Sequence, residues 1–180
     1  WEEFGPSAFA TRIRAEAMRD FGPSLSPMNA FILLQGIETL SLRMDKHMSN
    51  TQAILDFLSN HDQVSWVNHP NLPSHPSFQL AQKYLSKGAG SIVSFGVKGG
   101  RDAGKSFIEN VSLASHLANV GDAKTLIIHP ATTTHSRIDS DALVAAGITE
   151  DMIRLSVGLE NVEDIKADFE NGFRASRKIQ

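Results

Sequence analysis

Met152-Ile-Arg-Leu-Ser-Val-Gly-Leu-Glu160 is the stretch around which we expect this 180-residue chain to fold. Apolar residues recur at every second position of this stretch, which predicts a β-strand, because successive side chains on a strand point to opposite faces. Ile153, Leu155 and Val157 share an apolar face, and Arg154 lies on the other. The planar guanidinium of Arg154 can there bind a carboxylate or a phosphate through two hydrogen bonds at once. A solvated arginine on an exposed face is the alternative.

The rest of the chain alternates between further strands and short helices. Strands are predicted near 64–67, 91–98, 113–117 and 126–129. Helices are predicted near 77–85, 102–111 and 140–146, the last capped by Ser140, and a final helix buries Val162, Ile165, Phe169 and Phe173. The pattern predicts an α+β (α/β) domain, with one sheet of four or five strands and helices packed on one face.

A long helix is predicted over 26–60. Ser26-Pro27 is a typical helix start, and apolar residues then recur at helical spacing from Phe31 to Leu58. Such a helix would be roughly 50 Å long, and Gly36 inside it would weaken it by about 1 kcal/mol relative to alanine. Residues 1–25 mix turn signals with a short helical pattern and would bury little.

Composition excludes several classes of protein. A net charge of −3 and a pI near 6.2 disfavour nucleic-acid binding. No apolar run approaches the roughly 18 residues of a membrane span. The chain has no cysteine, which excludes disulfides and thiolate metal sites and favours the cytoplasm. His69 and His75 lie in a loop without carboxylate companions, so we expect solvated histidines there and no metal site.

Two polar motifs have simple structural explanations. The glycines of 88–90 and 99–100 lack the spacing of a phosphate-binding loop and are expected in turns. Thr132, Thr133, Thr134 and His135 could suggest a hydroxyl nucleophile with a histidine base. Because no orienting carboxylate or oxyanion site is indicated, we expect a hydrogen-bonded loop near a pocket rim instead.

Three stretches resemble a known family. Arg154 to Glu160 with the following Asn-Val-Glu-Asp-Ile is similar to the C-terminal signature of the Cys/Met-metabolism family of pyridoxal-phosphate (PLP) enzymes. The run from His116 to His135 resembles the form of that signature found in O-acetylhomoserine sulfhydrylases. So does the sequence around Arg19-Asp-Phe-Gly-Pro-Ser-Leu-Ser-Pro. The resemblance covers nearly the whole chain in order.

The resemblance implies a position within a larger enzyme of fold type I. Residues 1–25 would end the large PLP-binding domain, 26–60 would form a connecting helix, and 61–180 would form the C-terminal small domain with a mainly antiparallel sheet. The family's Schiff-base lysine lies in the large domain, and none of the eight lysines here has the expected Ser-x-x-Lys setting. We therefore expect no catalytic or cofactor-binding residue in this chain, which begins at Trp1 and fits a fragment or a chain paired with its other half.

The implied substrate-binding residues are Arg154 and Asn119. In the family, these positions hold the carboxylate of the amino-acid substrate, and the Asn119 position is often serine in the lyases. The implied reaction forms homocysteine from O-acetyl-L-homoserine and sulfide, in enzymes that are commonly homotetramers. The alternatives are a methionine γ-lyase, a cystathionine γ-synthase, and a standalone inactive binding domain without the cofactor.

Overall fold

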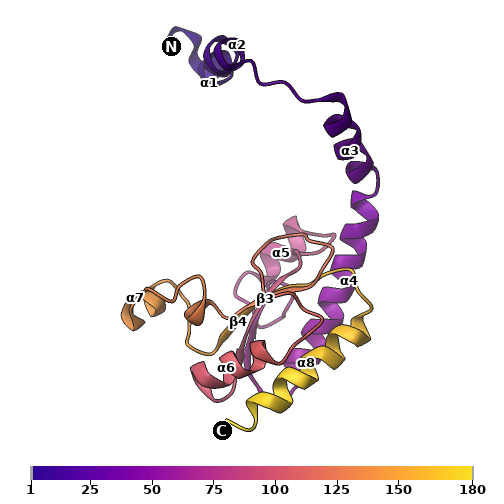
Figure 1. The fold of residues 1–180 in the computed structure, drawn as a ribbon, viewed down its shortest axis with the longest axis vertical. Helices are drawn as coiled ribbons and strands as arrows, with labels where there is room; N and C mark the ends of the chain where they lie inside the picture. The colour runs from indigo at the N-terminus through magenta and orange to yellow at the C-terminus, as the bar shows by residue number, and fades with distance from the viewer. Residues whose placement is uncertain (1, 180) are drawn as a thin grey trace. The chain divides into compact units, whose positions relative to one another are not determined.

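The computed structural model describes residues 2–179, apart from the side chain of Ser140. The chain divides into two compact units, Trp1–Leu40 and Ser41–Gln180 (Figure 1). In the described residues, no helix is both long and apolar enough to cross a lipid bilayer.

The first unit consists of helical segments. A 3₁₀ helix, η1 (Glu2–Ser7), leads into α1 (Ala8–Arg12), the π-helical segment η2 (Ile13–Met18) and α2 (Arg19–Phe21). After a short linker comes α3 (Pro27–Glu38). The backbone N–H of Asn29 donates to Ser26 Oγ at 3.2 Å, which confirms the predicted helix start.

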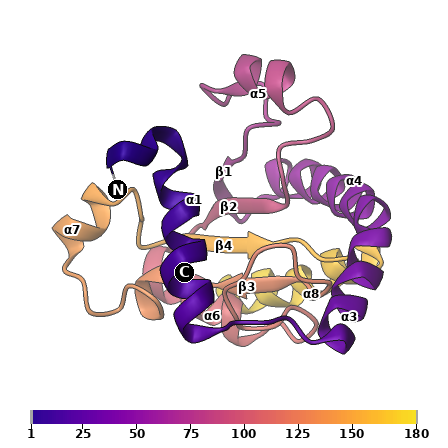
Figure 2. The same cartoon turned by 90° about the horizontal axis from the view of Figure 1, so that it is seen from above.

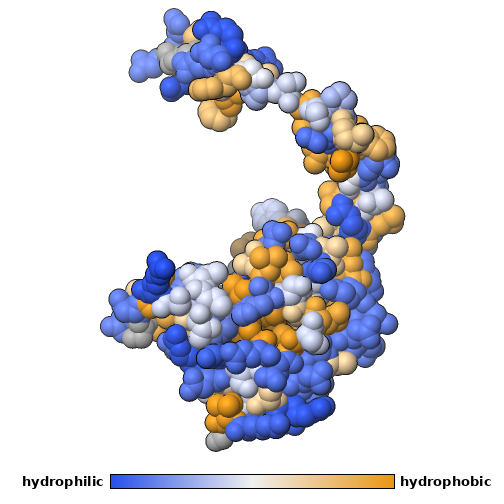
Figure 3. Space-filling model, viewed as in Figure 1, coloured by the Kyte–Doolittle hydropathy of each residue, from blue (hydrophilic) through white to orange (hydrophobic). Residues whose placement is uncertain are grey.

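None of the described residues of the first unit is buried. Along α3 the large apolar side chains are exposed, and Figure 3 shows them as a concentration of hydrophobic surface. They are Met28, Phe31, Ile32, Leu33, Leu34 and Ile37. This unit therefore has no hydrophobic core of its own.

The single helix predicted over 26–60 is instead two helices, α3 and α4 (Leu40–Ser59). Thr39 separates them, with φ −102° and ψ 4°. Two local features weaken the helix here, since Gly36 has a high conformational entropy when unfolded and β-branched Thr39 is restricted at χ1. The connecting role assigned to 26–60, and the assignment of 1–25 to a large domain, stay predictions.

The second unit is built on a four-stranded sheet. Its strands are β1 (Val64–Asn68), β2 (Ile92–Val97), β3 (Leu126–Ile128) and β4 (Met152–Ser156). Their order is β1-β2-β4-β3, and every neighbouring pair is antiparallel. The predicted antiparallel sheet is confirmed, and β4 lies between two neighbours.

Helices cover one face of this sheet. The helices of the unit are α4, α5 (Phe78–Tyr84), α6 (Gly100–Glu109), α7 (Ser140–Ala145) and α8 (Val162–Ser176), with a 3₁₀ turn, η3, at Pro130–Thr132. Side chains of α4, α6 and α8 form one core with the inward residues of β2 and β4, and in Figure 2 α8 passes behind β3. Ile153 and Leu155 are fully buried in it, as predicted.

The prediction of a strand at 113–117 is wrong. Only Ser115 pairs, in one isolated parallel bridge with Leu126. The buried carboxylate of Asp168 on α8 accepts hydrogen bonds from the backbone N–H groups of Ser112 at 2.7 Å and Ala114 at 3.0 Å. Those N–H groups are thereby satisfied by a side chain, and the segment runs as a loop.

The end of the signature stretch is tied to two other segments. The Asn50 amide on α4 donates to the carbonyl oxygens of Gly158 and Glu160, both at 2.9 Å. The Glu160 carboxylate accepts from the Thr125 N–H at 2.6 Å and hydroxyl at 2.8 Å, and Gly158 N–H donates to that hydroxyl at 2.9 Å. This network fixes where β4 ends beside the start of β3.

Two further local predictions can be compared with the structure. Asp139, rather than Ser140, caps α7, because its Oδ1 accepts from the Ala142 N–H at 2.9 Å. Gly147 follows the helix with φ 73°, as expected for a glycine that ends a helix.

Candidate functional site

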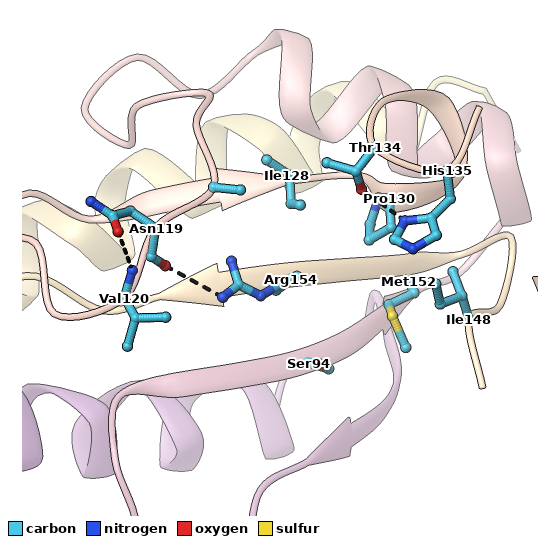
Figure 4. Close-up of a pocket in the computed structure, with 11 residues that line it drawn as sticks. Ser94, Asn119, Val120, Ile128, Pro130, Thr134, His135, Ile148, Met152 and Arg154 are labelled. Atoms are coloured by element: carbon cyan, nitrogen blue, oxygen red, sulfur yellow. Dashed lines mark hydrogen bonds between the residues drawn. The ribbon is translucent and has the colours of Figure 1, made fainter. Parts of the chain in front are cut away.

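A pocket of about 450 Å³ lies on the face of the sheet opposite the helices (Figure 4). Strands β2, β3 and β4 form its floor, and the segments around 118–120, 130–135 and 148 form its sides. Its lining residues are Ser94, Ala118, Asn119, Val120, Ile128, Pro130, Thr134, His135, Ile148, Met152 and Arg154. Both predicted substrate-binding residues, Arg154 and Asn119, are therefore in one pocket.

Arg154 is placed by the register of the sheet. It pairs with Ser94 on β2 and with Ile128 on β3, so its side chain leaves the central strand on the pocket face. Its Nη2 donates to the Asn119 carbonyl oxygen at 3.3 Å. Among the described residues, no carboxylate forms an ion pair with it, and none lines the pocket. Donors of the guanidinium are therefore left for an anionic ligand.

Asn119 contacts Arg154 through its main chain. Its side-chain Oδ1 accepts a hydrogen bond from the Val120 N–H at 2.9 Å, which closes the turn, while its carbonyl oxygen faces Arg154 (Figure 4). We expected both a turn and a hydrogen bond from Asn119 to the ligand. The structure has the turn, and the contact with a substrate carboxylate stays a prediction for both residues.

Away from Arg154 the pocket is mostly apolar. Ile128, Pro130, Ile148 and Met152 form this part of the lining. Thr134 and His135 stand at the rim and are hydrogen-bonded to each other, Oγ1 to Nδ1, at 2.8 Å. The prediction that this polar loop lies near a pocket rim is confirmed. A cation at one end and apolar walls at the other suit a ligand with a carboxylate and a short uncharged chain.

His129 is a buried residue beside the pocket-lining residues Ile128 and Pro130, and the sequence reasoning missed it. It is fully buried directly behind the pocket, with Nε2 2.8 Å from the Glu150 carbonyl oxygen and Nδ1 2.8 Å from Thr132 Oγ1. Burial lowers the pKa of His129 from its ordinary value of 6.5, and the hydrogen bond to Glu150 opposes this shift in part. A histidine that ends the apolar run of 126–128 was the signal available in the sequence.

The prediction of solvated histidines in the 69–75 loop is wrong for His69. Its side chain is 1% exposed; Nδ1 accepts from the Asn71 N–H at 3.1 Å, and Nε2 donates to the Gly90 carbonyl at 3.1 Å. Burial lowers the pKa of His69, and the bond to Gly90 partly offsets the effect. In the described part of the chain, no three His, Asp or Glu residues gather in an arrangement that could hold a metal ion.

The glycines near 88–90 and 99–100 behave as turn residues. Gly88, Gly90, Gly99 and Gly100 all have positive φ, which L-residues with a side chain rarely adopt. The prediction of turns is confirmed for Gly88, Gly90 and Gly99, which lie outside helices and strands, whereas Gly100 is the first residue of α6.

Comparison with known proteins identifies what this chain resembles. Residues 7–174 match the family described as Cys/Met metabolism PLP-dependent enzyme. Sulfhydrylase FUB7 of Fusarium oxysporum f. sp. lycopersici is 51% identical over 174 residues, which cover 97% of this chain and 40% of that protein. O-acetyl-L-homoserine sulfhydrylase 1 of Thermus thermophilus is 49% identical over 167 residues, 93% of this chain and 40% of its own length.

Solved structures give the same result for the fold. A putative O-acetylhomoserine (thiol)-lyase from Campylobacter jejuni, which carries N'-pyridoxyl-lysine-5'-monophosphate, aligns with a TM-score of 0.82 at 40% identity, covering 93% of this chain and 40% of that one. Cystathionine gamma synthase from Xanthomonas oryzae pv. oryzae, in complex with cystathionine, aligns with a TM-score of 0.78 at 34% identity, covering 89% and 41%. This chain thus spans about two fifths of the length of these relatives.

The lining of the pocket suits a carboxylate better than an aldehyde cofactor that attaches to a lysine. Its lining contains one permanently charged side chain, that of Arg154, and no lysine. The described residues around it can bind a carboxylate, and they offer no amine for covalent attachment of an aldehyde cofactor.

Proposed function

Because the chain belongs to the Cys/Met metabolism PLP-dependent enzyme family, we propose that it is the C-terminal portion of an O-acetylhomoserine sulfhydrylase. The complete enzyme would convert O-acetyl-L-homoserine and sulfide to homocysteine and acetate, in methionine and cysteine biosynthesis in the cytoplasm. Relatives that are 49% and 51% identical and are named sulfhydrylases support this choice.

The observation that carries the proposal is an arginine at one end of the pocket that has no acidic partner among the described residues. Arg154 would bind the α-carboxylate of the substrate through two parallel N–H···O bonds, and Asn119 would orient the guanidinium through its carbonyl oxygen. The central strand β4 would hold the Arg154 side chain in place, so the bound amino acid would be kept in one orientation. The apolar walls would receive the uncharged part of the substrate.

Pyridoxal phosphate, on which the family depends, supplies an electron sink for the reacting carbon when it is bound. We propose that the large domain with the lysine for this cofactor is the partner of the present chain, and that the assembled enzyme is a homo-oligomer, expected to be a tetramer. By itself the chain would be inactive.

The test is a visible absorption spectrum of the purified sample, with denaturing mass spectrometry on the same material. Absorption of bound pyridoxal phosphate, with a second polypeptide carrying the cofactor on a lysine, is the expected result. A single 19.6 kDa species without cofactor absorption would favour the standalone inactive domain instead.

Cystathionine γ-synthase is the second candidate, because a structure of that enzyme aligns with most of this chain at 34% identity. A product assay separates the two activities. O-acetyl-L-homoserine would be supplied with sulfide or with cysteine, and a sulfhydrylase forms homocysteine with sulfide. Preferential formation of cystathionine would overturn the first proposal, and release of a thiol from methionine would indicate a γ-lyase.

A further inference from the structure

Two chain segments that line the pocket are joined beneath it by a buried histidine. His129 is 0% exposed, and its Nε2–H donates to the carbonyl oxygen of Glu150 at 2.8 Å. Its Nδ1 lies 2.8 Å from the Thr132 hydroxyl, and its own carbonyl oxygen accepts from the Thr133 hydroxyl at 2.8 Å. The ring therefore connects the 130–135 segment to Glu150, which lies between Ile148 and Met152 in the sequence.

The same two segments are joined a second time from the surface. Arg101, in the first turn of α6, donates from Nη1 to the Glu150 carboxylate at 2.7 Å and from Nη2 to the Ala131 carbonyl at 3.0 Å. One guanidinium thus bridges Glu150 and the 130–135 segment on the outside, while the imidazole of His129 bridges them on the inside.

The shape of α6 accommodates this arrangement. A Cβ on Gly104 would lie 2.9 Å from His129 Nε2, so the absence of a side chain at 104 leaves the space that the imidazole fills. Arg101 and Gly104 are one helical turn apart and face the same segments. Neither His129 nor Arg101 lines the pocket, yet Pro130, Thr134, Ile148 and Met152 on the joined segments do.

We propose that His129 and Arg101 are positioning residues that together hold the wall of the pocket opposite Arg154. Breaking either bridge lets the 130–135 segment move relative to Ile148 and Met152, which changes the space beside the guanidinium. The bridges themselves follow from the contacts of this chain. Their consequence for substrate binding rests on the proposed function.

Amide hydrogen exchange of the 180-residue chain tests the bridges without any enzyme assay. The amides to follow are those of His135, which donates to Pro130 at 2.9 Å, and Met152, which donates to Thr149 at 3.1 Å. Amides of α8 are the internal reference. Arg101→Met and His129→Gln should each accelerate exchange at His135 and Met152 roughly tenfold relative to α8, the loss expected for one net hydrogen bond to a charged or buried group.

Lys105→Met is the matched control, because Lys105 lies on the same helix and its one ion pair with a described residue is an exposed one, with Glu109 at 3.9 Å. It should leave all these exchange rates unchanged. Equal exchange in Arg101→Met and Lys105→Met would overturn the proposal, and so would acceleration of α8 by the same factor, which would indicate general destabilisation. His129→Gln removes the ring nitrogen that contacts Thr132 Oγ1 and so breaks the connection to the 130–135 segment, while its amide can still donate to Glu150. It thereby avoids the empty buried site that His129→Leu would create.

Kinetics of the enzyme assembled with its cofactor domain test the consequence for substrate. Arg101→Met should raise KM for O-acetyl-L-homoserine severalfold with kcat within about twofold, and Arg101→Lys should recover part of the loss, since positioning acts mainly through binding. An unchanged KM beside altered hydrogen exchange would overturn the role in the pocket. A wild-type sample without activity would count against the proposed function alone, because the exchange result does not depend on it.

Discussion

Among the described residues, Arg154 donates to one acceptor, the Asn119 carbonyl, and its remaining donors face a mostly apolar pocket. In the assembled enzyme, Arg154→Ala should raise KM for O-acetyl-L-homoserine about 10- to 100-fold and lower kcat, because a charge-assisted pair of roughly 1.5–3 kcal/mol is lost and the substrate is less well oriented. Arg154→Lys should recover only part of the affinity, since an ammonium cannot form the two parallel bonds.

Steady-state kinetics measure this effect, and Arg174→Ala, on the exposed surface of α8, is the control. Kinetics of Arg154→Ala that equal those of the control would remove Arg154 from the proposed site.

Buried histidines predict how stability depends on pH. Burial lowers the pKa of His69 and of His129 below the ordinary value of 6.5. As pH falls through 6.5 the unfolded chain binds protons that the folded rings do not, so the free energy of unfolding decreases. Urea unfolding should therefore show lower stability at pH 5.5 than at pH 7.5. His69→Gln should reduce the difference, because glutamine does not titrate, and a flat profile in the unchanged chain would contradict the prediction.

At the scale of elements, one carboxylate determines the path of the 112–114 segment. Asp168 accepts two backbone N–H groups through separate oxygens and is 5% exposed. Asp168→Asn should lower the free energy of unfolding by about 1–3 kcal/mol, because an amide replaces one acceptor with a donor and leaves a buried N–H unpaired. Chemical denaturation checks this. Asp56→Asn, on the exposed side of α4, should change stability by less than about 0.5 kcal/mol, and an equal loss in both variants would count against the assigned role.

The turn after β4 depends on the close approach of Gly158 to the backbone of Lys124 and Thr125. A Cβ on Gly158 would overlap the backbone of Lys124 and Thr125 and the Glu160 carboxylate. Gly158→Ala should therefore cost about 1–3 kcal/mol and disturb the hydrogen bonds that hold β4 beside β3. Gly36→Ala is the comparison, since a Cβ there meets no atom within 4 Å and alanine favours a helix. Thermal unfolding of both variants measures the difference, and a Gly158→Ala chain as stable as Gly36→Ala would contradict the packing argument.

At the scale of the whole molecule, the hydrophobic core belongs to the second unit. All the core residues lie between Ile54 and Phe173, and no described residue of Trp1–Leu40 is buried. A chain lacking residues 1–40 should therefore keep the sheet and unfold within a few degrees of the intact chain, a shift of roughly 1 kcal/mol or less. Circular dichroism on both chains measures this, and loss of a cooperative transition after the deletion would show that the first unit stabilises the second.

Local patterns in the sequence predicted several parts of the fold. The alternation of apolar residues in 152–157 predicted the two faces of β4, and the spacing of Ile165, Phe169 and Phe173 predicted the buried side of α8. Ser26-Pro27 predicted the start of α3. These are periodic or capping signals carried by residues close together in the chain, so they can be recognised without knowing the tertiary structure. The family resemblance, which rested on linear motifs, was equally available.

Contacts between residues far apart in the sequence were decided only by the tertiary structure. Asp168 turns a predicted strand into a loop from 54 and 56 residues away, and Asn50 reaches Gly158 across 108 residues. The pairing of β4 with both β2 and β3 places Arg154 between Ser94 and Ile128 and creates its pocket. The burial of His129 and His69 likewise depends on segments that pack over them. The sequence determined which residues could carry an anion site and on which face of a strand, because side-chain direction follows local backbone geometry. The surroundings of that site depend on long-range packing, which periodicity does not encode.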